Sequence, residues 1–168
     1  RFRAFEIDIK GSDWHELSTG AQVDKNDFSI KIGRKKVRFE AAFAALHGAP
    51  LENGQMQGYL EMMGVPYTCC DGFVSALTMN KAATKAVLAP HGVPMAASVL
   101  LKKGEGIDFE KLAALGIPVF VKPNDHGSSF GVSKVKTAED LPKAIDFAFS
   151  FSENVLVEAF MPGREFAN

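Results

Sequence analysis

The order in which strand-like and helix-like patterns follow one another limits the fold of this 168-residue chain more than any other feature. Strand-like patterns occupy 5–9, 37–46 and 65–68 in the first part of the chain. Helix-like patterns occupy 55–63, 72–79 and 81–89. Strands that alternate with helices favour an α/β layer, in which the apolar run of Val37–Leu46 is typical of a buried parallel strand.

The pattern changes after Pro94, where short strands are separated by tight turns. Strands are predicted at 97–102, 117–122, 132–135 and 155–160, and another is predicted to begin at 164–166. Asp108 is placed to cap a short helix. Thr137 is placed to cap a longer one, because it opens the sequence T-A-E-D, in which Asp140 takes the position of the usual Glu or Gln. This part is therefore predicted to be an α+β unit with hairpin-like strands.

The two patterns predict two domains, residues 1–94 and 95–168, with the boundary near 92–96. A chain of this length is enough for one ordinary domain or two small ones. Hydrophobic residues make up 46% of the chain and charged residues 23%, which is typical of a globular protein.

Charge and cysteine usage exclude several classes of protein. A net charge of −1 gives no electrostatic reason to expect nucleic acid or an acidic membrane as a partner. The apolar runs are far shorter than the ~18 residues of a membrane span, and the alternating start RFRAFEIDIK is unlike a signal peptide. The adjacent Cys69 and Cys70 would form a strained disulfide and lack metal ligands at ordered spacing, so we expect free thiols in a reducing compartment.

The segment VKPNDHGSSFGVSKV contains a loop, GSSFG, that either binds an anion or only turns the chain. It matches neither a Walker loop nor G-x-G-x-x-G, and a glycine-bounded β-turn accounts for its composition. In the functional alternative, Gly127, Ser128 and Ser129 present backbone N–H groups and hydroxyls to an anion. Lys122 favours this alternative, because a lysine in an apolar strand must reach either an anion or solvent.

Four further residues are candidates for a site. Lys81 lies near a predicted helix start, where the helix dipole disfavours a cation unless a phosphate is bound; otherwise it is a surface lysine. His47 follows a predicted strand, where ligands of open α/β sheets collect, although an ordinary strand-end histidine fits equally. Glu158 interrupts the apolar VLVEAF and faces either solvent or a nucleotide. Glu165 is either a surface acid or an acceptor for ribose hydroxyls.

Four segments occur together in one order: HGAPLENGQMQGYLEMMGVPYT, SALTMNK, IPVFVKPNDHGSSFGVSKV and VLVEAFMPGREF. From about Phe39 to Phe166, the chain resembles the D-alanine–D-alanine ligases. The resemblance implies a Rossmann-like N-terminal domain followed by the first (central) lobe of an ATP-grasp fold. It implies ATP and two Mg²⁺ ions as cofactors, and a cytoplasmic homodimer that serves peptidoglycan synthesis.

The resemblance also implies a reaction and residue roles. One D-alanine carboxylate attacks the γ-phosphate of ATP, and the amine of a second D-alanine attacks the resulting acyl phosphate. Lys122 and Lys81 match lysines that contact the phosphates, Ser128 and Ser129 match a loop that closes over them, and His47 matches a histidine near the first D-alanine. The remaining ATP contacts match Gly127 and Ser129 in the loop, Glu158, Ala159, Phe160 and Met161 at the adenine, and Glu165 at the ribose.

The chain departs from the family pattern in two ways. Leu51 replaces a usual glycine, which is expected to alter the loop after His47. The family's first glycine-rich loop is expected before Arg1, and its magnesium ligands and catalytic arginine are expected beyond Asn168. The resemblance thus implies part of a longer enzyme, which binds portions of ATP and does not catalyse the reaction alone.

Several alternatives to this interpretation are open. The second substrate could be D-lactate or D-serine, or the enzyme could be another ATP-grasp carboxylate–amine ligase. The chain could also be a non-catalytic ATP-binding module, or a plain α/β domain whose loops are only turns.

Overall fold

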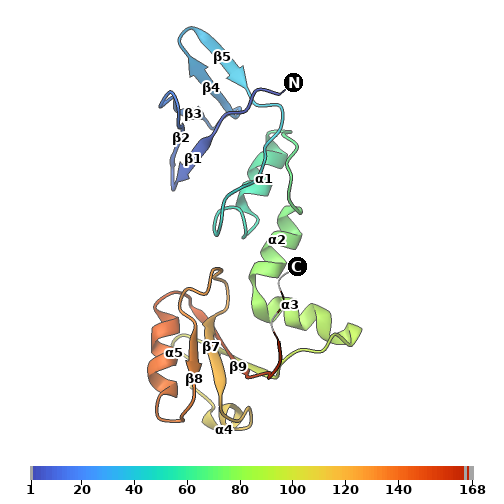
Figure 1. Ribbon diagram of the computed structural model, residues 1–168, viewed down its shortest axis with the longest axis vertical. Helices are drawn as coiled ribbons and strands as arrows, with labels where there is room; N and C mark the ends of the chain where they lie inside the picture. Colours follow the sequence, from blue (N-terminus) through green and yellow to red (C-terminus); the bar gives the residue numbers. More distant parts are fainter. Residues whose placement is uncertain (1, 165, 167–168) are drawn as a thin grey trace.

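The computed structural model describes residues 2–164 and residue 166. The molecule is elongated, with small antiparallel sheets at one end, a larger sheet at the other and three helices in succession between them (Figure 1). No helix in the described part of the chain is both long enough and apolar enough to cross a membrane.

The first part of the chain forms two antiparallel sheets. Strands β1 (Ile7–Lys10) and β2 (Asp13–Glu16) pair in one, and β3 (Val23–Asp24), β4 (Ser29–Ile32) and β5 (Lys35–Arg38) form the other in that order. The predicted half-buried strand at 5–9 is confirmed as β1, because its alternating apolar residues rest on a small core. That core consists of Trp14, Val23, Phe28, Ile30, Leu51, Met56, Leu60 and Val65.

The predicted buried parallel strand at Val37–Leu46 is wrong. Only its first two residues belong to a strand, β5, which pairs antiparallel with β4. From residue 41 to 46 the exposure of side chains alternates, and Phe43 is 84% exposed. One isolated parallel bridge, between Ala42 and Tyr67, replaces both this strand and the one predicted at 65–68. Without further strands to pair with, an apolar run does not form a sheet by itself.

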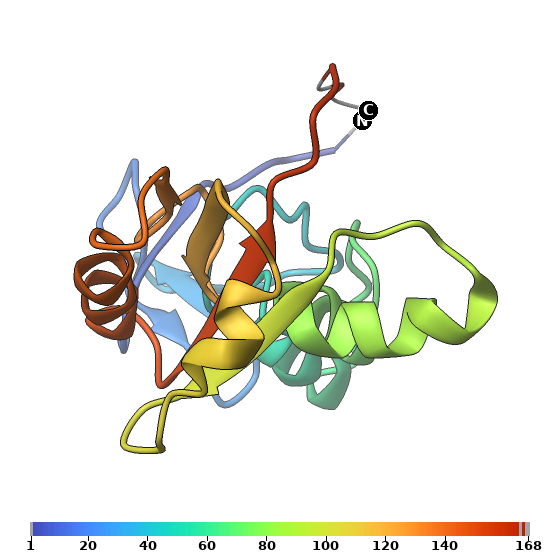
Figure 2. The ribbon, with the colours of Figure 1, turned by 90° about the horizontal axis from the view of Figure 1, so that it is seen from below.

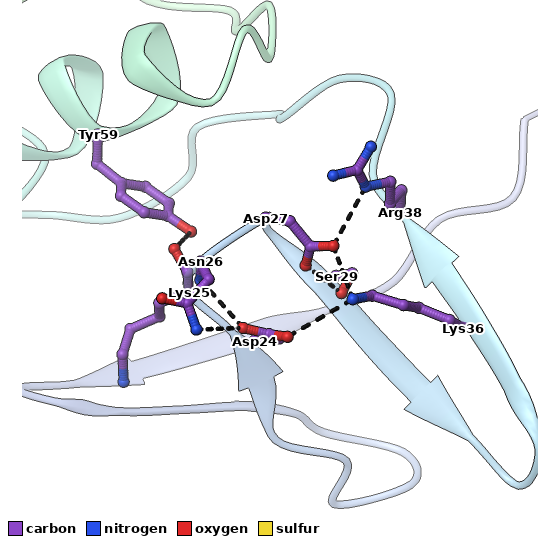
Figure 3. A network of polar contacts seen from close by, with 8 residues as sticks. All are labelled: Asp24, Lys25, Asn26, Asp27, Ser29, Lys36, Arg38 and Tyr59. Atoms are coloured by element: carbon purple, nitrogen blue, oxygen red, sulfur yellow. Dashed lines mark hydrogen bonds and ion pairs between the residues drawn. The ribbon is translucent and has the colours of Figure 1, made fainter.

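A network of polar contacts fastens the three-stranded sheet (Figure 3). The carboxylate of Asp27 accepts from Ser29 Oγ over 2.6 Å and pairs with Lys36 Nζ over 2.7 Å and Arg38 Nε over 3.3 Å. The hydrogen bonds from Lys36 and Ser29 lower the pKa of Asp27 to about 2. The hydroxyl of Tyr59, on the first helix, donates to the carbonyl of Lys25 over 2.9 Å, which joins that helix to the sheet.

Three helices lead away from this region, each at a position that the sequence predicts. Helix α1 is Gln55–Met62, α2 is Gly72–Met79 and α3 is Lys81–Leu88, followed by the 3-10 turn η1 (Ala89–His91). The side chain of Asp71 caps α2 by accepting from Val74 N over 2.8 Å, and that of Asn80 caps α3 by accepting from Ala83 N over 2.9 Å.

The last part of the chain is a four-stranded antiparallel sheet in the order β6-β9-β7-β8. Its strands are β6 (Ser98–Lys102), β7 (Val119–Pro123), β8 (Ser133–Val135) and β9 (Asn154–Ala159), and its helices are α4 (Phe109–Ala113) and α5 (Leu141–Phe149). Helix α5 covers one face, while α2 and α3 lie on the other side (Figure 2). The core between sheet and α5 includes Val119, Val121, Val155, Val157, Ile145 and Ala148.

The hairpin-like α+β organisation predicted after Pro94 is confirmed, with two corrections. Asp140, and not Thr137, occupies the N-cap position of α5, and it makes no capping hydrogen bond; the Thr137 hydroxyl donates to its carboxylate over 2.8 Å. Arg164 and Phe166 do not form the strand predicted at 164–166. The division into domains 1–94 and 95–168 stays a prediction.

Candidate functional site

The face of the four-stranded sheet that turns away from α5 carries polar and aromatic side chains. Along β7, Val119, Val121 and Pro123 are buried, whereas Phe120 and Lys122 between them are only half-buried. Because side chains alternate between the two faces of a strand, Phe120 and Lys122 share the open face. Strand register places Lys134, Phe120, Glu158 and Ser98 in one row across β8, β7, β9 and β6.

Two lysines meet at Glu158 on this face. Lys122 pairs with Oε2 of Glu158, and Lys85 Nζ on α3 lies 2.6 Å from Oε1. All three side chains are about four-fifths buried, with exposed fractions of 22% for Lys122, 19% for Lys85 and 18% for Glu158. Glu158 therefore faces neither solvent nor an empty site in this structure, and both carboxylate oxygens are engaged.

Burial raises the pKa of Glu158, but hydrogen bonds from Lys122 and Lys85 outweigh it and hold the pKa below its ordinary value. The carboxylate thus stays ionised although most of its side chain is buried. Lys85 was not among the sequence candidates. Its spacing of four residues from Lys81 places both on one face of α3, and that spacing is the one sequence signal that could have found it.

Lys81 is the first residue of α3 and reaches the end of β7. Its ammonium group donates to the carbonyl of Pro123 over 3.0 Å and to that of His126 over 2.6 Å. Burial, followed by the charge of Lys122, lowers its pKa. The ammonium group of Lys81 thus lies partly buried at a helix N-terminus and close to a second lysine. An anion bound beside it would stabilise its charged form.

Asn124 fixes the position of Lys81 relative to the sheet, and no pattern in the sequence indicated this role. Its side chain is 2% exposed and accepts from Ala82 N over 2.9 Å, while its Nδ2 donates to Asn80 Oδ1 over 2.8 Å. Its carbonyl accepts from the backbone N–H of Lys81 over 3.0 Å. The start of α3 is therefore attached to the end of β7 at three points.

An aromatic group borders the ion cluster. The rings of Phe120 and Phe160 lie 6.1 Å apart, and Lys134 Nζ sits 3.7 Å from the centre of the Phe160 ring. Phe160 and the following Met161 are exposed, at 36% and 58%. The backbone N–H groups of Ala159 and Phe160 already donate to Ala97 and Pro118, over 2.9 and 3.1 Å. Because the Phe160 ring is partly exposed, a planar ring could stack on it.

The GSSFG loop is a tight turn with an unusual backbone. Ser128 and Ser129 have φ values of 50° and 58°, and Phe130 N donates to the Gly127 carbonyl over 3.3 Å. Two consecutive positive φ values are the pattern of a type I′ turn, in which Asn and Gly are the usual residues. Serine in this conformation costs energy, and such strain collects at functional sites. Both serines are exposed, so their hydroxyls are available to a ligand.

His47 lies at the same loop. It borders a cavity of about 180 Å³ together with Gly127 and Ser128, and its exposed ring is 3.9 Å from the Glu52 carboxylate. The premise that His47 ends a buried parallel strand is wrong, but the structure does bring His47 and the loop together. Leu51, where the sequence departs from the family pattern, is buried in the core, with 8% of its surface exposed.

A metal site does not follow from the described residues. Among residues 2–164 and 166, no three His, Cys, Asp or Glu side chains are grouped so that they could hold a metal ion. Glu165, which was expected at a ribose, lies outside the described residues. Within the part of the chain that is described, the site is thus a cationic and aromatic surface without metal ligands of its own.

Comparison with known proteins gives consistent matches. Residues 87–167 match the family model described as "D-ala D-ala ligase C-terminus". A D-alanine–D-alanine ligase of Phocaeicola vulgatus is 43% identical over 98% of this chain and 52% of its own length. The chain therefore spans about half the length of the curated relatives it matches.

Solved structures agree with the sequence comparison. D-alanyl-alanine synthetase A from Vibrio cholerae superimposes with a TM-score of 0.84 and 30% identity, over 94% of this chain and 49% of that one. D-alanine–D-alanine ligase from Bacillus anthracis, in a complex with ATP, superimposes with a TM-score of 0.69 and 32% identity, over 74% of this chain and 42% of that one.

Proposed function

Because this chain belongs to the family of D-alanine–D-alanine ligases, we propose that its open sheet face binds ATP for the ligation of two D-alanines. The product, D-alanyl-D-alanine, would serve peptidoglycan synthesis. The whole activity is a proposal, since the chain corresponds to about half of each relative's length.

The observation that carries this proposal is the group of lysines at the end of β7. Lys122 comes from the strand and Lys81 from the start of α3, and burial, followed by the charge of Lys122, lowers the pKa of Lys81. Two neighbouring cations repel each other, and an anion that binds between them offsets this repulsion. A polyphosphate supplies that anion, and Phe160 supplies a surface on which the adenine ring stacks.

Five of the predicted site residues have a role in the proposed phosphoryl transfer. Phosphoryl transfer depends on positioning and on neutralising charge more than on covalent help from the protein. Lys122 and Lys81 would neutralise the phosphates. The loop that contains Ser128 and Ser129 would close over them and exclude water, which protects an acyl phosphate from hydrolysis. His47, at the same cavity, would support the first D-alanine.

The proposed function includes magnesium, although no group that could hold a metal ion is found among the described residues. A homodimer and a cytoplasmic location also remain proposals that rest on the family.

For the fold, we propose that the first part of the chain has a Rossmann-like arrangement. Ala42 and Tyr67 form a parallel bridge, and α1 lies between them in the sequence. A strand, a helix and a parallel strand are the unit from which such layers are built. The segment 42–46 also borders an apolar cavity of about 510 Å³ with β1, a surface that further strands could cover.

The test is a direct assay of the full-length gene product with ATP and D-alanine. We expect ADP release that depends on D-alanine, with D-alanyl-D-alanine identified by mass spectrometry. Parallel reactions with D-lactate or D-serine as second substrate separate the related ligases. ATP binding without any turnover would favour a non-catalytic ATP-binding module, and failure to bind ATP would overturn the proposal.

A further inference from the structure

The proposed function assigns no role to Lys85, which lies within the ion cluster at Glu158. Its ammonium group donates to the Ala96 carbonyl over 2.5 Å and to Glu158 Oε1 over 2.6 Å. Ala96 lies between η1 and β6, and Glu158 lies on β9, so Lys85 joins α3 to two separate parts of the chain. Only 19% of its side chain is exposed.

The other partner of Glu158 is Lys122, to which the proposed function assigns a phosphate of ATP. Lys122 pairs with Glu158 Oε2 here, whereas the proposed function requires it to pair with a phosphate. When Lys122 turns to the phosphate, Glu158 loses half of the interactions that keep it ionised. A half-buried carboxylate without a partner either becomes protonated or moves toward solvent.

We propose that Lys85 is a positioning residue that holds Glu158 in place and ionised while Lys122 moves to the phosphates of ATP. The inference rests on the proposed function, since it requires Lys122 to serve the nucleotide. Lys85 suits this role because its second contact, to the Ala96 carbonyl, is independent of Lys122 and holds the ammonium group at Glu158.

The two lysines of α3 therefore have different roles. Lys81 lies at the loop end of the sheet, where it contacts the Pro123 and His126 carbonyls, and Lys85 lies one turn further along, at Glu158. The charged groups that act on Glu158 come from α3 and β7: Lys85, Lys122 and, at longer range, Lys81. On β6 the paired residue is Ser98, which does not titrate, and on β8 Lys134 lies beyond Phe120.

The proposal predicts a proton uptake that a purely structural lysine would not cause. In a Lys85→Met variant, Glu158 would lose its remaining partner when ATP binds, and it would take up a proton from solvent. Isothermal titration calorimetry of ATP binding in buffers of different ionisation enthalpy measures this uptake. We expect additional proton uptake in Lys85→Met compared with wild type, and ATP affinity about tenfold below wild type, as for loss of one charged hydrogen bond.

Two variants complete the experiment. Lys85→Arg keeps the positive charge and should restore both the affinity and the proton count of wild type. Lys143→Met, on the exposed side of α5, controls for removal of a lysine far from the site. Circular dichroism spectra confirm that each variant is folded, and an unfolded Lys85→Met is replaced by Lys85→Gln.

The outcomes separate this inference from the proposed function. If wild type binds ATP and Lys122→Met weakens binding, but the Lys85 variants have the wild-type proton count, only the role of Lys85 is overturned. An equal loss of affinity at all pH values, without proton uptake, would likewise assign Lys85 a structural role alone. If wild type does not bind ATP, both proposals are overturned.

Discussion

Gly131, the last residue of the GSSFG loop, packs directly against the ring of Phe151. A methyl group on its Cα would lie 2.7 Å from Phe151 Cδ2 and 2.6 Å from Pro123 Cγ. Its φ is +72°, in the left-handed region that favours glycine. The loop therefore ends at a fixed point between β7 and Phe151, while its serines remain exposed.

Gly131→Ala is expected to destabilise the protein by about 2–4 kcal/mol, since it adds overpacking to an unfavourable backbone conformation. Urea unfolding measures the change. Gly106→Ala is the matched control, because a methyl group there meets no atom within 4 Å and its φ is not in the left-handed region. Equal stability of the two variants would mean that the packing at Gly131 does not limit the loop.

Lys122→Ala is expected to weaken ATP binding by about ten- to a hundredfold, because one charged hydrogen bond to a phosphate is lost. Turnover should fall at least as far, since developing charge on the transferred phosphoryl group is no longer neutralised. Calorimetry and an ADP-release assay of the full-length gene product measure the two effects. Lys103→Ala, which removes an exposed lysine paired with Glu153, serves as control. Unchanged affinity and turnover would remove Lys122 from the site.

Lys81→Met should release the start of the loop, because the contact from the ammonium group to the His126 carbonyl is lost. Hydrogen exchange of residues 125–131 is then expected to be faster than in wild type without nucleotide. In wild type, ATP should slow exchange in the same segment, as the loop closes. Lys136→Met, which removes an exposed lysine directly after β8, is the control. Equal exchange with and without ATP in wild type would argue against a closing loop.

Glu16 should make stability depend on pH in the acid range. Its side chain is buried, and hydrogen bonds from Thr19 and then Ser18 lower its pKa to about 2. Because the folded pKa lies below the unfolded one, the contribution is complete above about pH 4.5 and is lost as the pH falls toward 2. Thermal unfolding of Glu16→Gln should therefore differ from wild type most at neutral pH and least near pH 2. The exposed Glu6→Gln should follow wild type throughout, and a difference for Glu16→Gln that is constant with pH would contradict this explanation.

Spacing along the chain was sufficient for the helices and for four of the five strands predicted after Pro94. Asp71, Asn80 and Asp108 cap helices where short polar residues precede helical patterns, and β7 alternates as IPVFVKP suggests. These features depend on neighbours within a few residues. The error at Val37–Leu46 has the opposite cause, since an apolar run becomes a parallel strand only if other strands lie beside it.

The sequence by itself determined which side chains carry charge, where the helices lie and where most strands after Pro94 lie, and the resemblance indicated Lys81, Lys122 and Glu158 as site residues. Only the tertiary structure decided how these residues are paired. Lys85 and Glu158 are 73 residues apart, and they meet because strand register places Glu158 beside Phe120 and α3 packs over that face. Local spacing contains no information on such a contact, because the partner of a buried charge is set by the register of the sheet and by the helix that covers it.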